Sequence, residues 1–118
     1  MESSDKKLLR LVLPQGILDY FKVTKVIHTS EQIDIQLEEQ NIIPEEFANE
    51  HLISKGFLEE IRIQDFPIRG KGVYLLVKRR RWTNETSGNI VCRNWDYVSK
   101  GTRITKEFAS FLKVIARY

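Results

Sequence analysis

The chain has 118 residues, enough for one domain, and its 42% hydrophobic and 30% charged residues match an ordinary globular protein. A single cysteine excludes an intramolecular disulfide, and with two histidines besides it predicts no metal site and no cofactor. The sequence has no apolar run of the roughly 18 residues that a membrane span needs, and it does not begin like a signal peptide. We therefore expect a cytoplasmic protein with no membrane partner.

The charge is divided unevenly along the chain. Residues 1–67 contain 7 Lys/Arg and 13 Asp/Glu, a net charge of −6, whereas residues 68–118 contain 12 and 3, a net charge of +9. This concentration of cations is typical of proteins that bind a polyanion. The alternative is intramolecular pairing between the acidic and the basic half.

The acidic half has the patterns of helices followed by a hairpin. Apolar spacing, proline positions and polar alternation predict, in order, a helix at Lys6–Leu13, a short helix from Pro14, a strand at Tyr20–Thr29, a turn at Ser30-Glu31, a strand at Ile33–Leu37, a helix start within Asn41–Phe47 and a connector at Asn49–Gly56. In the first strand Phe21, Val23, Lys25 and Ile27 are expected to share one face.

The basic half has the patterns of hairpins followed by a helix. The predicted elements are a strand at Phe57–Phe66, a turn at Pro67–Gly72, a long strand at Val73–Trp82, a polar turn at Thr83–Asn89, a short strand at Ile90–Cys92, and a last helix with Phe108, Phe111, Leu112 and Ile115 on one face. The fold class is therefore α+β, with short N-terminal helices, antiparallel hairpins forming a ribbon-like sheet, and a C-terminal helix. We expect one domain, 1–118, with an acidic part at 1–56 and a basic part at 57–118.

The sequence contains no catalytic constellation. Gly70-Lys71-Gly72 lacks the spacing and the following helix of a phosphate-binding loop, so it is interpreted as a hairpin turn. Cys92 on a short apolar strand is interpreted as a small buried residue rather than a nucleophile. Paired glutamates such as Glu59-Glu60 would point to opposite faces of a strand. We therefore expect a protein that is not an enzyme.

The strongest local signal is the run Lys78-Arg79-Arg80-Arg81-Trp82. In a strand, Arg79 and Arg81 share one face, while Lys78, Arg80 and Trp82 share the other. Guanidinium groups suit phosphate oxygens, and an exposed tryptophan stacks on a base, so all five residues are predicted to bind DNA. The alternatives are a nuclear-localisation-like charge run and a solvated edge strand that resists aggregation.

A second basic segment precedes the last helix. Lys100, Arg103, Thr105 and Lys106 combine cations and a hydroxyl near a helix N-terminus, where backbone amides favour phosphate. These four residues complete the predicted DNA-binding set, and a plain helix cap from Thr105 or Thr102 is the alternative. Trp95 and Tyr97 are interpreted as core residues.

Taken in order, these segments resemble the N-terminal region, or small upstream reading frame, of a group of prokaryotic insertion-sequence transposases. In that group a strand ending in an x-D-x-P turn pairs with a strand ending in R-R-[FW], and R-x-T opens the next helix. Here Gln64-Asp65-Phe66-Pro67, Arg80-Arg81-Trp82 and Arg103-Ile104-Thr105 match these motifs. The resemblance covers about half of the chain, from Phe57 onward.

The chain departs from this family in its cysteines. Relatives of this type carry two cysteine pairs that form a zinc ribbon, whereas Asn84 stands about where a cysteine would follow Trp82. Family transposases cut DNA with a three-carboxylate, two-metal centre in a separate ribonuclease-H-like domain, which this chain is too short to contain. The resemblance therefore implies a non-catalytic module of DNA transposition and recombination that binds the ends of a mobile element in double-stranded form.

Two other classes of function stay open. In the main rival, the acidic half docks a protein partner such as the catalytic transposase subunit, and affinity for DNA is incidental. The other class is a small hydrolase. Salt dependence separates DNA binding from apolar docking, because phosphate contacts lose affinity linearly with the logarithm of salt concentration.

Overall fold

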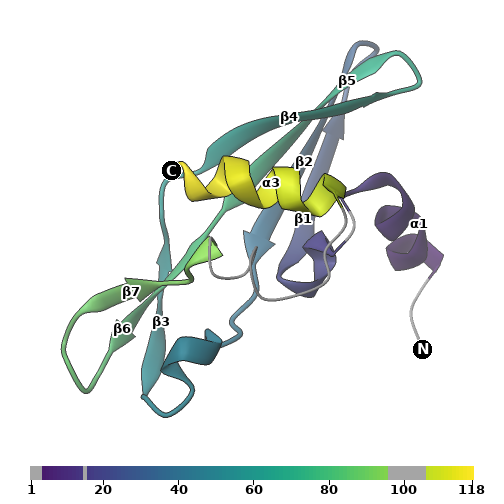
Figure 1. The fold of residues 1–118 in the computed structure, drawn as a ribbon. Coiled ribbons are helices and arrows are strands. Elements are labelled where there is room, and N and C mark those ends of the chain that lie inside the picture. The colour runs from purple at the N-terminus through teal and green to yellow at the C-terminus, as the bar shows by residue number, and fades with distance from the viewer. Residues whose placement is uncertain (1–3, 15, 96–105) are drawn as a thin grey trace. The chain divides into compact units, whose positions relative to one another are not determined.

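The computed structural model describes residues 4–14, 16–95 and 106–118, with the backbone alone at 106–108. The chain forms two compact units, Met1–Tyr20 with Asn94–Tyr118 and Phe21–Arg93. The elements are α1 (Ser4–Val12), the 3-10 helix η1 (Ile17–Asp19), β1 (Phe21–His28), β2 (Gln32–Glu39), the 3-10 helix η2 (Glu45–Phe47), β3 (Leu52–Phe57), β4 (Ile61–Ile68), β5 (Lys71–Lys78), β6 (Arg80–Asn84), β7 (Ile90–Cys92) and α3 (Lys106–Ala116) (Figure 1). The α+β class that the sequence predicts is confirmed: an N-terminal helix, two mostly antiparallel sheets and a C-terminal helix.

The unit Phe21–Arg93 is organised around a long two-stranded ribbon. One side of the ribbon is β3 followed by β4, and the other is β5 followed by β6, with antiparallel pairing from Leu52 opposite Asn84 to Ile68 opposite Lys71. The predicted strand Val73–Trp82 is therefore two strands, which part at Arg79. The Arg79 carbonyl still accepts a hydrogen bond from the Leu58 amide at 2.8 Å, so the two sides stay joined at the break.

The predicted connector at Asn49–Gly56 is wrong, because most of it belongs to β3. The register between β3 and β6 shifts between Ser54 and Phe57, and Gly56 lies in this irregularity with φ 86°. A left-handed backbone is open to glycine, so Gly56 marks a bulge inside the strand rather than its boundary. The division expected after residue 56 consequently falls inside β3.

The expectation of purely antiparallel sheets also needs correction. The four-stranded sheet has the order β1-β2-β5-β4, and β2 pairs with β5 in parallel from Gln32 opposite Gly72 to Glu38 opposite Lys78. The Gly72 amide also donates to the Glu31 carbonyl at 3.0 Å. The β1–β2 hairpin thus covers the edge that β5 leaves free when it pairs with β4.

A bulge in β1 changes which side chains share a face. Val23 lies opposite Leu37 and Lys25 lies opposite Gln36, so Thr24 is the extra residue. Val26 therefore shares a face with Val23, and Lys25 moves to the other face. The predicted face of Phe21, Val23, Lys25 and Ile27 is wrong beyond Val23.

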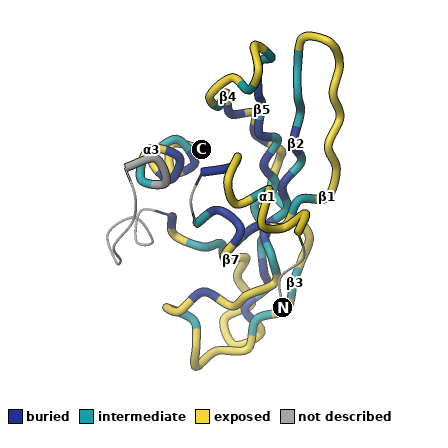
Figure 2. The backbone as a smooth tube through the Cα atoms, turned by 90° about the vertical axis from the view of Figure 1, so that its right-hand side faces the viewer, coloured by how far each residue is buried: buried dark blue, intermediate teal, exposed yellow. Residues whose placement is uncertain are grey.

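The four-stranded sheet has one apolar face. Its buried side chains come from alternate positions of the central strands and β4, which is the period-two pattern of a sheet with one face in the core. These residues are Ile35, Leu37, Ile61, Ile63, Val73, Leu75 and Val77 (Figure 2). The apolar face that the sequence predicts for the hairpin strand Ile33–Leu37 is confirmed at Ile35 and Leu37.

In the unit Met1–Tyr20 with Asn94–Tyr118, helix α3 buries Phe111, Leu112 and Ile115, as the apolar spacing predicts. Phe108 is outside the residues whose side chains are described. Trp95 is 5% exposed and meets the Tyr20 ring edge-on at a centroid distance of 5.5 Å. Trp95 is therefore a core residue of this unit, as predicted, while Tyr97 lies outside the described residues.

Candidate nucleic-acid interface

The predicted basic strand presents its arginines in two different settings. In the three-stranded sheet, β6 lies between β3 and β7, with Ser54 opposite Trp82 and Cys92 opposite Arg81. Arg80 and Trp82 face the interior of this unit, whereas Arg81 shares the opposite face with Cys92. The separation of Arg81 from Arg80 and Trp82 follows the predicted alternation, whereas Arg79 lies between β5 and β6, outside either strand.

Arg80 is occupied by contacts within the fold. Its backbone amide donates to Glu39 Oε1 at 2.9 Å, and its Nε donates to the Glu39 carbonyl at 3.0 Å. Its Nη1 donates to Ser54 Oγ, and the guanidinium lies 4.7 Å from the centre of the Phe57 ring. We therefore interpret Arg80 as a structural residue that ties β6 to β2 and β3, rather than as a phosphate ligand.

The partner of Arg80, Glu39, forms a buried ion pair. Glu39 is fully buried, and its Oε2 accepts from Arg93 Nε at 2.9 Å, while Arg93 Nη2 donates to the Ile42 carbonyl. Burial raises the pKa of Glu39, and the hydrogen bonds and charges of Arg93 and Arg80 act against that rise. Burial thus disfavours the charged form of Glu39, and the hydrogen bonds and charges of Arg93 and Arg80 stabilise it.

Trp82 is a core residue and has no accessible ring face for a base. Its side chain is 0% exposed, and its indole Nε1 donates to Asn41 Oδ1 at 2.9 Å. The sequence predicts that Trp82 stacks on a DNA base. This prediction is corrected, because the side chain is enclosed in the core. Asn84 is also buried, donates to Glu50 Oε1 and accepts from the Thr86 amide.

The opposite face of the three-stranded sheet carries a group of cations, here called the outer cation cluster, made of Lys55, Arg79 and Arg81. Arg81 Nε donates to the Lys55 carbonyl at 3.2 Å. Arg79 Nε is buried and has no hydrogen-bond partner among the described residues. A buried N–H is rarely left unpaired, so this nitrogen is unusual among the described side chains, and its burial keeps a phosphate from reaching it unless the side chain moves.

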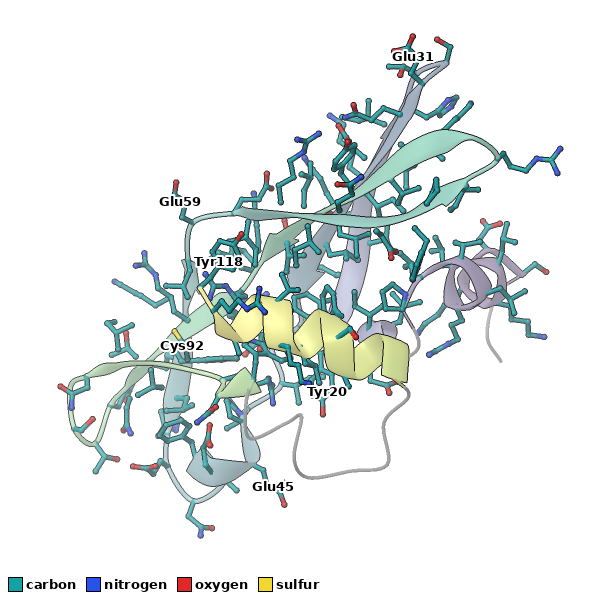
Figure 3. The ribbon with its side chains drawn as sticks, turned by 45° about the horizontal axis from the view of Figure 1, so that its top comes forward. Tyr20, Glu31, Glu45, Glu59, Cys92 and Tyr118 are labelled. Atoms are coloured by element: carbon teal, nitrogen blue, oxygen red, sulfur yellow. The ribbon has the colours of Figure 1, made fainter. Side chains whose placement is uncertain are left out.

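Cys92 marks the position of this cluster (Figure 3). Burial raises the pKa of the Cys92 thiol and so does the charge of Glu39, while the charges of Arg79 and Arg81 lower it. The net rise keeps the thiol protonated at neutral pH.

The remaining predicted residues are placed as follows. Lys78 ends β5 opposite Glu38, on the polar face of the four-stranded sheet. Lys100, Arg103 and Thr105 lie outside the described residues, and so does Thr102, the alternative helix cap. Lys106 is the first residue of α3, and its side chain is not described. Convergence of the two basic segments on one surface stays a prediction.

Sequence reasoning missed Glu39, Asn41, Arg93 and Lys55. Glu39 follows a strand with ordinary polar alternation, and Arg93 follows the short strand β7, so neither has a local pattern that signals burial. Lys55 lay in the segment interpreted as a connector. A carboxylate at the end of an otherwise apolar strand face is the one available signal for Glu39, because residues 35, 37 and 39 share a side.

No family model matches the chain, and no curated protein and no solved structure is significantly similar to it. The described helices include none that is long and apolar enough to cross a membrane. Within the described ranges, no three His, Cys, Asp or Glu side chains come together as a metal site would require.

We expect protein purified without chelator to contain far less than one zinc per chain. One cysteine and two histidines cannot supply the four Cys/His ligands of a ribbon-type site. Elemental analysis by plasma mass spectrometry measures this directly, with a zinc-ribbon protein prepared in parallel as the positive control. A ratio near one zinc per chain would contradict the prediction.

Proposed function

We propose that the chain is a non-catalytic DNA-binding module of an insertion-sequence transposase, which recognises the ends of its element. The observation that carries the proposal is the outer cation cluster: Arg81 donates to the Lys55 carbonyl and Arg79 precedes β6, whereas Arg80 is held inside by Glu39 and Ser54. The motif order from Phe57 onward and the net charge of +9 in residues 68–118 support the same function.

The chemistry of the cluster suits the phosphate backbone. Arginine binds phosphate through a planar fork of donors, and the outer cation cluster supplies two guanidinium groups and one ammonium group. Contacts of this kind position a protein on duplex DNA without reading its sequence.

A protein-docking module is the second candidate, and one surface favours it. Ile42 and Ile43 are 44% and 38% exposed beside the exposed carboxylates of Glu45 and Glu46. This acidic and apolar surface would suit a basic partner such as a catalytic transposase subunit. The apolar part of this contact would depend weakly on salt and its charged part would weaken as salt rises, so mutation of the outer cation cluster separates this candidate from DNA binding.

The cluster is tested by replacing Lys55, Arg79 and Arg81 together with glutamine. If each neutralises one phosphate, the slope of log K against log salt should flatten by about three units, and binding should weaken alike on all sequences. Fluorescence anisotropy of a labelled duplex, titrated at several KCl concentrations, gives this slope. Circular dichroism checks that the variant is folded.

The matched control replaces Lys7, Lys113 and Arg117 with glutamine, which makes the same change in net charge at exposed positions. We expect this control to lose less than about one unit of slope. Equal losses in both variants would mean that only total charge matters. An unchanged slope in the cluster variant would place the docking candidate first.

A further inference from the structure

Strand β4 carries an exposed aromatic side chain at an irregular position near the turn of the β4–β5 hairpin. The pairing of β4 with β5 shifts between Asp65 and Ile68, so Phe66 and Pro67 lie in the irregularity. Phe66 is 75% exposed, and Pro67 is exposed beside it. Phe66 and Pro67 thus place two neighbouring apolar side chains near the end of the ribbon, where a partner can reach them.

The residue that closes this hairpin is also unusual. Arg69 and Gly70 form the two-residue turn, with φ of 54° and 79°, and both values are positive as in a type I′ turn. Asparagine or glycine suits the first of these positions, while a long side chain there is strained. Strain of this kind is found at functional sites, where the side chain has a use that offsets its cost.

The hairpin has the charge that a polyanion would complement. Residues 61–78 contain four basic residues and one acidic residue, a net charge of +3, and the basic residues are Arg62, Arg69, Lys71 and Lys78. Arg69 in the turn and Lys71 just after it are close in sequence to Phe66. An exposed aromatic ring with cations nearby in the sequence suits nucleic acid better than an apolar protein surface.

Contacts within the hairpin and with the neighbouring hairpin hold the region next to its turn in place. The Arg62 guanidinium lies 3.7 Å from the centre of the Tyr74 ring. The Tyr74 ring packs against Gly72, where an added Cβ would lie 3.4 Å from Cε2. The Glu31 carbonyl, at the turn of the neighbouring hairpin, accepts from the Gly72 amide.

We propose that the β4–β5 hairpin is a DNA-bending arm, in which Phe66 and Pro67 insert between base pairs in the minor groove while Arg69 and Lys71 contact the flanking phosphates. This inference rests on the proposed function and adds a second contact, at the opposite end of the ribbon from the outer cation cluster. Apolar wedges on minor-groove proteins unstack a base step and kink the duplex by roughly 20–90°. The arm therefore predicts bending, which phosphate contacts alone do not require.

The test uses an A·T-rich duplex with fluorophores at its two ends and 2-aminopurine at TA steps, which are the easiest steps to unstack. Binding of the wild-type chain should raise 2-aminopurine fluorescence and increase energy transfer between the ends. Phe66→Ala should abolish both signals and weaken binding about tenfold, the effect of losing one stacked ring. Phe66→Leu retains an apolar wedge and should keep much of the bend.

Two further variants isolate the wedge from other effects. Ile90→Ala removes a different exposed apolar side chain, 51% exposed in β7, and should leave both signals unchanged. Arg69→Asn should keep the 2-aminopurine signal and flatten the salt slope by about one unit. It should also preserve or raise the unfolding temperature, because asparagine accepts the left-handed backbone.

The outcomes separate the arm from the proposed function. If Phe66→Ala binds DNA with wild-type fluorescence and energy transfer, the arm is wrong while DNA binding stands. If the wild-type chain does not bind duplex DNA at low salt, both proposals fall. If Phe66→Ala changes self-association in sedimentation velocity but not the DNA signals, the tip is a protein contact and the arm is overturned.

Discussion

Replacement of Arg93 with alanine is expected to lower the free energy of unfolding by about 3–5 kcal/mol at pH 7.5. The reason is the Glu39 carboxylate, which is fully buried and accepts from Arg93 Nε at 2.9 Å. Without the guanidinium, the remaining side-chain hydrogen bond of Glu39 that the structure describes is the one from the Arg80 amide. Since a domain of this kind is stable by roughly 5–15 kcal/mol, the variant should be close to unfolding.

The loss of unfolding free energy in Arg93→Ala should depend on pH, and its direction follows from the pKa of Glu39. Burial raises the pKa of this carboxyl above its ordinary value of 4.5, so the folded state binds the proton more tightly than the unfolded state. The stability linked to Glu39 is therefore fully present below the unfolded pKa and is lost as the pH rises through the folded pKa. Removing Arg93 raises the folded pKa further, so the deficit of Arg93→Ala should be smaller at pH 5 than at pH 7.5.

Urea unfolding of the wild type and Arg93→Ala at both pH values measures this difference. Arg81→Ala is the control, because it removes an arginine from the exposed side of the same sheet and should cost less than about 1 kcal/mol at either pH. Adding Glu39→Gln to Arg93→Ala should remove the pH dependence of the deficit. A deficit below about 1 kcal/mol at both pH values would contradict a buried ion pair.

Replacement of Trp82 with alanine is expected to destabilise the fold by about 3–5 kcal/mol, the range for a large aromatic side chain removed from a core. Trp82 is 0% exposed, and its indole nitrogen donates to Asn41 Oδ1. Trp82→Phe keeps much of the packing but loses the hydrogen bond, so it should cost roughly 1–3 kcal/mol. Thermal and urea unfolding of both variants provide the measurement.

The same two variants separate a core role from a stacking role. Because the ring is enclosed, Trp82→Phe should bind duplex DNA with the affinity and salt slope of the wild type at a temperature where both are folded. A loss of affinity about as large as that expected for Phe66→Ala, with little loss of stability, would show that the ring reaches a base. The comparison uses two aromatic residues of one ribbon, one enclosed and one 75% exposed.

Local patterns in the sequence were sufficient for much of the fold. Apolar spacing predicts the buried side of α3, and alternation with a Ser30-Glu31 turn predicts the β1–β2 hairpin. Alternation also predicts that Arg79 and Arg81 lie on the opposite face from Arg80 and Trp82. These features depend on the period of a helix or strand, which is a property of neighbouring residues.

Irregular positions and pairings between distant segments could not be predicted in this way. Thr24 is an extra residue in β1, so the side chains after it point to the opposite face from the predicted one. Gly56 lies in a bulge that interrupts the alternation of β3, so the sequence pattern does not indicate a strand there. The parallel pairing of β2 with β5 joins segments about 40 residues apart. A bulge depends on the partner strand as much as on its own sequence, so no local period contains it.

The roles within the arginine run were likewise decided by tertiary structure. The sequence by itself determined that Lys78–Arg81 is strongly basic and that its side chains alternate. Only the folded chain places Glu39 where Arg80 and Arg93 reach it, which makes these arginines structural and leaves Arg81 on the other face, opposite Cys92. The physical reason is that a charge is buried only with its partners, and those partners come from β2 and the end of β7, far apart in the sequence.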